Sequence, residues 1–123
     1  MPYDITIKAT FSAAHQIRFN DTVEPLHGHD WKVTLSLGSH ELDDLGLVCD
    51  FHSVLRELKN LIRPFKNNNL NEVPPFDALN PTAENVAKYI GQTMARSFDN
   101  EHARVLWCRV TESPGCAARW IAG

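Results

Sequence analysis

The stretch that decides the fold is His27–Gly38, which reads HGHDWKVTLSLG. From Trp31 onward, apolar side chains take every second position, with polar residues or glycine between them. This period of two predicts a strand with one buried face. In such a strand His27 and His29 leave on the same face, about 7 Å apart at Cα. The segment therefore predicts a sheet that presents two histidines at one end.

A second alternating run lies upstream, from Tyr3 to Thr10, and leads into FSAAH at residues 11–15. The connection 17–25 is polar, so we expect the two strands to pair antiparallel and to bring His15 beside the other two histidines. Neutral imidazole suits zinc, and three protein ligands with one open position are its usual catalytic arrangement. The pattern predicts a zinc site. The alternative is a chance HxH pair on a solvated strand and a merely hydrogen-bonded His15.

Two helical segments follow. Asp50 is a natural N-cap for a helix that should end at Arg63-Pro64. Residues 66–77 are rich in Asn and Pro and predict a loop. A second helix should then begin, with Asn80 or Thr82 as its cap. Its buried face is expected to hold Val86, Ile90 and Met94.

Two strand-like segments end the chain, at residues 105–110 and 116–121, joined by the turn Ser113-Pro114-Gly115. Strict alternation is expected in the first of them, with both faces largely buried. The order ββααββ predicts a single α+β domain over residues 1–123, in which a four-stranded antiparallel sheet carries two helices on one face. Its two open edges favour oligomerisation.

Length, charge and cysteine content narrow the class of protein. The 123 residues suit one domain, and a net charge of −3 with scattered Lys and Arg argues against a nucleic-acid surface. We expect a cytoplasmic protein, because no secretory leader or membrane-length apolar segment is evident. Cys49, Cys108 and Cys116 lack CxxC spacing, so neither disulfides nor thiolate metal ligands are expected. We expect all three to be small buried residues. The alternative is that Cys49 or Cys116 lies beside the active site.

Six short motifs are spread along the whole chain. They are Phe11-Ser12-Ala13-Ala14-His15, Leu26-His27-Gly28-His29, Asp50-Phe51, Asn69-Leu70-Asn71, Asn80-Pro81-Thr82-Ala83-Glu84-Asn85 and Val110-Thr111-Glu112. Together they resemble the 6-pyruvoyl-tetrahydropterin synthase and 6-carboxy-tetrahydropterin synthase family, whose members have the tunnelling fold. The resemblance implies zinc held by His15, His27 and His29, a pterin substrate, and sheets that pair edge to edge into an oligomeric barrel. It also implies a homohexamer with active sites between subunits.

The same resemblance implies two substrate-binding residues. Glu112 would accept two parallel N–H bonds from the amino-pyrimidine edge of the pterin, and Thr82 would assist nearby. Taken without the resemblance, Glu112 is a solvated residue at a strand end. Thr82 is then a helix-start residue with no chemical role.

The chain departs from the best-known members in its catalytic groups. Those members carry a cysteine shortly before HGH and an Asp-His pair after the first helix. Here the cysteine positions hold Asp21 and Val23, and the pair falls on Lys66 and Asn67. Glu24 instead gives the spacing ExxHGH, similar to a subgroup in which glutamate replaces the cysteine. The resemblance therefore implies Glu24 as the catalytic acid–base group, with a solvated loop carboxylate as the alternative.

In that subgroup, dihydroneopterin triphosphate loses its side chain to give 6-hydroxymethyl-dihydropterin, a folate precursor. We therefore expect a zinc-dependent lyase with this substrate, in which Lys66 or Arg18 meets a phosphate. A 6-carboxy- or 6-pyruvoyl-tetrahydropterin synthase of the queuosine or biopterin type is the alternative within this class. A catalytically inactive pterin- or zinc-binding protein is the alternative from another class, favoured by the residues at 66 and 67. The expected partners are a small pterin and further copies of the chain, with no nucleic acid and no membrane.

Overall fold

The computed structural model describes all residues, 1–123. In chain order the elements are β1 (Tyr3–His15), β2 (His27–Ser39), α1 (Phe51–Ile62), η1 (Arg63–Phe65), β3 (Asn68–Asn69), η2 (Leu70–Glu72), α2 (Ala83–Phe98), β4 (Ala103–Ser113) and β5 (Cys116–Ile121). They form a five-stranded sheet in the order β3-β1-β2-β4-β5, antiparallel except between β1 and β3. The predicted α+β layout is confirmed, and the two-residue β3 adds a fifth strand within the predicted loop. None of the helices combines the length and apolar character that crossing a membrane requires.

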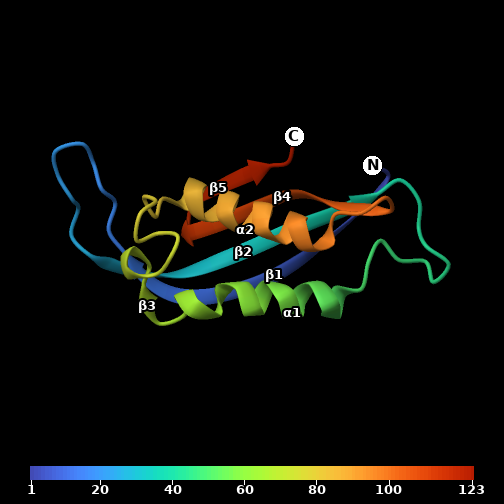
Figure 1. Cartoon of the computed structure of the whole chain (residues 1–123), viewed down its shortest axis with the longest axis horizontal. Coiled ribbons are helices and arrows are strands. Elements are labelled where there is room, and N and C mark those ends of the chain that lie inside the picture. Colours follow the sequence, from blue (N-terminus) through green and yellow to red (C-terminus); the bar gives the residue numbers. More distant parts are fainter.

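The two helices cover one face of the sheet. Helix α1 lies along β1, and α2 lies against β4 and β5 (Figure 1). Along β1 and the first half of β2, buried side chains alternate with exposed ones, so the opposite face is open. In the core Phe11 and Trp31 stack with ring centroids 5.8 Å apart, and Phe65 packs beside Phe11. This apolar layer between sheet and helices supplies the main driving force for folding.

Strands β1 and β2 pair in register over their whole length, from Tyr3 opposite Ser39 to His15 opposite His27. Side chains that lie opposite each other in an antiparallel pair share a face of the sheet. His29 pairs with Ala13, two positions further along that face. The predicted antiparallel pairing is confirmed. It gathers three imidazoles at one end of the sheet.

The expectation of strict alternation over residues 105–110, which lie in β4, is wrong. The register of β4 against β2 shifts at Leu106, which forms a bulge. An extra residue in one strand reverses the face that the following side chains take. Val105 and Cys108 are therefore both buried although they lie three positions apart.

The expectation that all three cysteines are buried is also wrong. Cys108 is buried within β4, and this burial raises the pKa of its thiol to about 12. Cys49 is half-buried. Cys116 is exposed because it begins β5, the outermost strand of the sheet, directly after the turn that joins β5 to β4. An alternating or apolar sequence does not reveal which strand lies at an edge.

The predicted helix starts are confirmed. The carboxylate of Asp50 accepts a hydrogen bond from the backbone N–H of His52, and α1 ends at Ile62 before a single turn of 3-10 helix. Of the two candidate caps for α2, Thr82 is the cap, since its hydroxyl accepts a 3.1 Å bond from the N–H of Asn85. A capping hydroxyl satisfies a backbone donor that the helix leaves without a partner.

Asn80 has a different task. Its side-chain Oδ1 accepts a bond from the N–H of Arg18 and its Nδ2 donates to the carbonyl of Arg18, both at 2.9 Å. Asn71 makes the same two bonds with the backbone of Gln16. Each side-chain amide bonds the N–H and the C=O of one backbone residue, as a neighbouring strand would. Together they form a clamp that holds the chain after β1 against the segment between β3 and α2. They thereby fix Pro81 against the end of β1.

We expect Asn80→Ala to lower the free energy of unfolding by about 2 kcal/mol, because two backbone groups of Arg18 lose their partner in a partly buried place. Asn80→Asp keeps the acceptor for the N–H of Arg18 but sets a carboxylate oxygen against its carbonyl, so we expect it to lower stability as well. Urea unfolding followed by circular dichroism measures both. Asn68→Ala is the control, since this exposed amide makes one bond, to Pro64, and should change stability little. Equal effects of Asn80→Ala and Asn68→Ala would contradict the clamp.

Candidate metal centre

The structure brings together the three histidines that the sequence singled out. His15 comes from the end of β1, and His27 and His29 come from the start of β2. The Nε2 atoms of His15 and His27 are 3.1 Å apart, and the ring centroid of His29 lies 5.2 Å and 4.7 Å from theirs. His15 is fully buried. The geometry agrees with the predicted ligand set, although their role as ligands stays a prediction.

Backbone carbonyls fix a proton on the Nδ1 atom of two of these rings. His15 Nδ1 donates to the carbonyl of Pro81 at 2.8 Å, and His27 Nδ1 donates to that of Pro25 at 2.8 Å. A neutral imidazole with its proton on Nδ1 has a bare lone pair on Nε2. Carbonyl partners of this kind commonly orient the histidine ligands of metals. Both lone pairs therefore point into the same small space, where they repel each other unless a cation lies between them.

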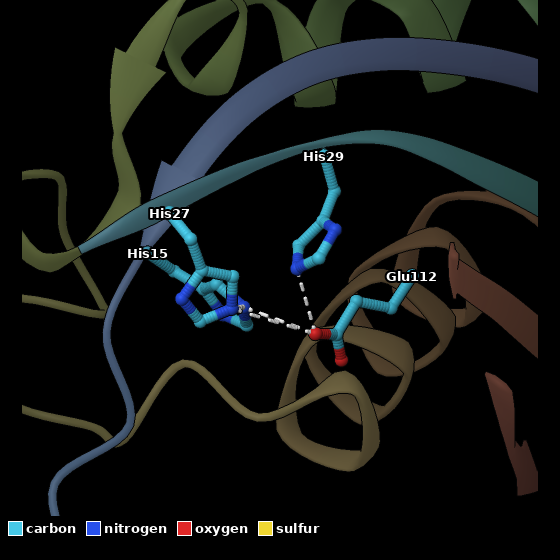
Figure 2. A group of neighbouring side chains, drawn as sticks. All are labelled: His15, His27, His29 and Glu112. Atoms are coloured by element: carbon cyan, nitrogen blue, oxygen red, sulfur yellow. Dashed lines mark hydrogen bonds and ion pairs between the residues drawn. The ribbon is translucent and has the colours of Figure 1, made fainter. Parts of the chain in front are cut away.

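The fourth member of the group is Glu112, near the end of β4. Its Oε1 lies 2.9 Å from His29 Nε2, 3.2 Å from His15 Nε2 and 3.9 Å from His27 Nε2 (Figure 2). The resemblance implied a substrate-binding role for this residue, and sequence reasoning did not foresee its carboxylate among the imidazoles. The cause is tertiary, because β4 pairs with β2 and carries residue 112 to the histidine end of the sheet.

The positions of the four donor atoms fit a metal ion. His29 Nε2 is buried and makes no hydrogen bond, even though Glu112 Oε1 is 2.9 Å away. A buried ring nitrogen without a hydrogen bond, next to a carboxylate, suits a cation bound by both. Bonds of 2.0–2.1 Å to a tetrahedral zinc place its ligand atoms about 3.3 Å apart. Four of the separations between donor atoms, 2.9, 3.1, 3.2 and 3.9 Å, lie on both sides of that value.

The protonation of His29 also suits metal binding. Burial lowers the pKa of His29, and the neighbouring His15 and His27 lower it further, while the charge of Glu112 acts in the opposite direction. A lowered pKa keeps the ring neutral near pH 7, with a lone pair available. Metal binding requires that neutral form. His15, His27, His29 and Glu112, whose donor atoms all lie within 4.8 Å of one another, could hold a metal ion.

Glu24 lies at the rim of this group. Its Oε1 accepts a 2.9 Å bond from the backbone N–H of Ile17 and lies 3.7 Å from His27 Nε2. The side chain is 28% exposed, so it is neither free in solvent nor sealed from it. The alternative of a solvated loop carboxylate does not describe this position. Glu24 is a held carboxylate that faces the centre.

The other predicted site residues lie apart from the four donors. The hydroxyl of Thr82 is used as the cap of α2, one residue after Pro81, which contacts His15. Lys66 is exposed after η1 and belongs to a different hollow. Arg18 directs its guanidinium toward the carbonyl of Phe76, at 3.4 Å.

A hollow of about 430 Å³ adjoins the centre. His29 and Glu112 both line it, together with Gly28 and Lys32. A Cβ built on Gly28 would meet nothing within 4 Å, so the backbone here is open to a ligand. A substrate in this hollow would lie directly beside the group of donors.

Comparison with known proteins identifies the family. The family model described as 6-pyruvoyl tetrahydropterin synthase matches residues 4–121. A protein of Archaeoglobus fulgidus named "Putative 6-carboxy-5,6,7,8-tetrahydropterin synthase" is 32% identical over 91 residues, which are 74% of this chain and 75% of that protein. The 6-pyruvoyl tetrahydropterin synthase of Caenorhabditis elegans superposes with a TM-score of 0.84 at 21% identity, over 98% of this chain and 96% of its own.

A second similar structure is the 6-pyruvoyltetrahydropterin synthase of Plasmodium vivax, in a variant with a catalytic glutamate changed to alanine. It has a TM-score of 0.73 at 20% identity and covers 96% of both chains. At these identities the structural likenesses show the shared tunnelling fold. The family model spans nearly the whole chain, and the chain therefore belongs to the 6-pyruvoyl tetrahydropterin synthase family and is a pterin-processing lyase.

Proposed function

We propose that this chain is a zinc-dependent lyase that acts on 7,8-dihydroneopterin triphosphate and removes its side chain to give 6-hydroxymethyl-7,8-dihydropterin. The observation that carries the proposal is the place of Glu24, whose Oε1 lies 3.7 Å from His27 Nε2 at the rim of the donor group. Neither the cysteine nor the Asp-His pair of the best-known members is present in this chain. The P. vivax variant supports the idea that a glutamate serves as a catalytic group on this fold.

His15, His27 and His29 would hold the zinc, which supplies Lewis acidity toward side-chain oxygens of the substrate when bound. Glu24 then acts as general base and takes the proton of the second side-chain hydroxyl. The bond between the first and second side-chain carbons breaks, and its electron pair passes into the pterin ring. The same proton returns to the first carbon. The products are the hydroxymethyl pterin and an aldehyde that carries the triphosphate, with no net oxidation.

The position of Glu112 determines whether the zinc keeps a coordination position open for the substrate. A centre closed by four protein ligands is typical of structural zinc, whereas a catalytic centre keeps one position open. We propose that Glu112 leaves the donor group when substrate binds and accepts the N–H groups of the amino-pyrimidine edge. Its place between the imidazoles and the hollow of about 430 Å³ supports this movement. A permanently bound Glu112 would instead favour the inactive zinc-binding protein.

Two further roles complete the proposal. Thr82 contacts the substrate as an accessory group near Pro81, while it keeps its capping bond. The chain also forms a homohexamer through its sheet edges, with active sites between subunits. Residues of β1 before Ala13 have no strand on their outer side, and β5 is open along its length. Open edges of this kind invite pairing with another chain.

The name of the A. fulgidus relative favours 6-carboxytetrahydropterin synthase activity as the second candidate. The two reactions differ in the product that remains on the pterin ring. Mass spectrometry of a reaction with purified zinc protein and 7,8-dihydroneopterin triphosphate separates them, since a hydroxymethyl and a carboxyl group differ in mass. We expect the hydroxymethyl product.

We expect the protein to bind one zinc per chain and His15→Ala to lose it, because that ring is the buried member of the group. Metal analysis after dialysis against zinc and removal of free metal measures the stoichiometry. His52→Ala is the matched control, as this exposed histidine lies on α1. Wild-type protein without bound zinc, or equal loss in both variants, would contradict the metal centre.

Glu24→Gln keeps an acceptor for the Ile17 N–H but removes the base, so we expect kcat to fall by roughly 10²- to 10⁴-fold. Zinc content and unfolding free energy should stay as in the wild type. Asp21→Asn, a change of the same kind in the same connection, should keep the rate. Full activity of Glu24→Gln would remove the mechanism and leave the family assignment intact.

For Glu112→Gln we expect zinc to be retained and the Kd for the hydroxymethyl pterin to rise at least tenfold, because a charge-assisted pair of hydrogen bonds is lost. Zinc analysis and calorimetric titration report the two effects separately. Loss of zinc with little change in pterin binding by the remaining metal-loaded protein would make Glu112 a permanent ligand. The lyase proposal would then be wrong.

A further inference from the structure

The connection between β1 and β2, residues 16–26, leaves the sheet as a narrow hairpin (Figure 1). Arg18 and Val23 form an isolated antiparallel bridge across it. Glu24 lies opposite Ile17 in this hairpin, since its N–H donates to the carbonyl of Ile17 at 3.1 Å. The place of Glu24 therefore depends on how the first arm of the hairpin is held.

A side chain replaces one backbone bond of this pair. Residues that face each other in this way in an antiparallel pair normally exchange both N–H···O bonds. Here the N–H of Ile17 donates instead to the carboxylate Oε1 of Glu24, at 2.9 Å. The displaced carbonyl of Glu24 accepts a bond from Nε2 of Gln16 at 3.1 Å. The carboxylate takes the place of its own carbonyl, and this exchange holds Oε1 at 3.7 Å from His27 Nε2.

The side chain of Gln16 makes the exchange favourable. Gln16 and Glu24 are both partly buried, and a carbonyl left without a partner in such a place costs free energy. The amide of Gln16 supplies that partner. Without it, the carbonyl of Glu24 would compete with the carboxylate for the N–H of Ile17. Gln16 therefore favours the arrangement in which the carboxylate is held beside the metal centre.

Two asparagines hold the opposite side of the same segment. Asn71 bonds both backbone groups of Gln16, and Asn80 bonds both backbone groups of Arg18, in all four cases at 2.9 Å. In an extended chain, successive residues turn their N–H and C=O groups to opposite sides. The clamp thus directs the two backbone groups of Ile17 to the other side, where the proposed base lies.

Both asparagines lie on well-anchored segments. Asn71 belongs to η2, where Leu70 is fully buried, and its N–H donates to Oδ1 of Asn69 at 3.0 Å. The carbonyl of Asn80 accepts a 2.9 Å bond from Nδ2 of Asn85, in the first turn of α2. The clamp is therefore built on places that the core and the start of α2 hold firmly.

We propose that Asn71, Asn80 and Gln16 are positioning residues that set the carboxylate of Glu24 for proton transfer. This inference rests on the proposed function, in which Glu24 is the general base. A base must lie within hydrogen-bond reach of the proton that it takes, and a misplacement of about 1 Å can cost roughly 10²-fold in rate. The bond from Ile17 occupies one carboxylate oxygen and leaves the other for the substrate hydroxyl. All of these bonds lie within one chain.

The first test compares the kinetics of zinc-loaded, assembled variants with 7,8-dihydroneopterin triphosphate. We expect Asn71→Ala to lower kcat roughly 10- to 100-fold, while KM changes less than about threefold and zinc content is unchanged. Asn71 is preferred to Asn80, because Asn80 directly precedes Pro81, whose carbonyl bonds a histidine of the centre. The control is Asn60→Ala, since this exposed amide of α1 accepts one bond, from Arg63, and should keep the wild-type kcat.

A double-mutant cycle separates positioning from structural weakening. If Asn71 acts through Glu24, Asn71→Ala should change kcat less than about threefold once Glu24→Gln has removed the base. Equal fold-losses in the two backgrounds would overturn the proposal, because they would show an effect independent of the carboxylate. An unchanged kcat of Asn71→Ala beside a slow Glu24→Gln would also overturn it and leave the proposed base intact.

Gln16→Met is an independent variant that leaves the clamp in place. Methionine has a similar length but no N–H donor, so the carbonyl of Glu24 should regain the N–H of Ile17 and release the carboxylate. We expect kcat to fall about tenfold, with zinc content and unfolding free energy close to those of the wild type. A wild-type kcat in this variant would contradict the exchange.

Hydrogen exchange followed by mass spectrometry tests the placement without turnover. Peptides over residues 16–26 should exchange at least about tenfold faster in zinc-loaded Asn71→Ala than in the wild type, while those over α2 stay unchanged. Unchanged exchange of residues 16–26 would contradict the clamp. Full activity of Glu24→Gln beside faster exchange would trace the failure to the proposed base and not to the way in which the hairpin is held.

Discussion

The register between β1 and β2 is the constraint on which the site depends. It sets His15 directly opposite His27, with His29 two positions along the same face. A slip by one residue would move every side chain of one strand to the other face and separate the rings. Trp31 fixes the register close to the site, since its buried indole N–H donates a 3.1 Å bond to the carbonyl of Ala13. The core therefore holds the histidines in place before any ligand is bound.

The centre itself is an arrangement that a bound metal ion would stabilise. Two imidazoles commit their Nδ1 protons to the carbonyls of Pro81 and Pro25, and their Nε2 lone pairs approach each other closely. Burial keeps His29 neutral, and Glu112 adds a negative charge beside all three. Polar groups placed this way at the end of a sheet cost stability unless they share a positive partner. That cost is consistent with a functional site.

Fold and chemistry are divided between different parts of the chain. The strands and helices give the tunnelling fold, which this protein shares with proteins only about a fifth identical in sequence. The residues that we propose distinguish the reaction lie on connections, where Glu24 precedes β2 and Lys66 follows η1. Connections tolerate substitution because few packing contacts restrict them. A family can therefore keep its donor group while its acid–base residue changes, and the reaction must be argued from the site.

The sequence by itself determined the local elements and one face of the site. Three features depend on residues close together in the chain and can therefore be predicted from the sequence. They are the period of two in β1 and β2, the capping carboxylate of Asp50 and the spacing of His27 and His29. Tertiary structure decided the rest, because it depends on which distant segments pair. The bulge at Leu106, the clamp at Asn80 and the arrival of Glu112 beside His29 all follow from contacts between residues far apart in the chain.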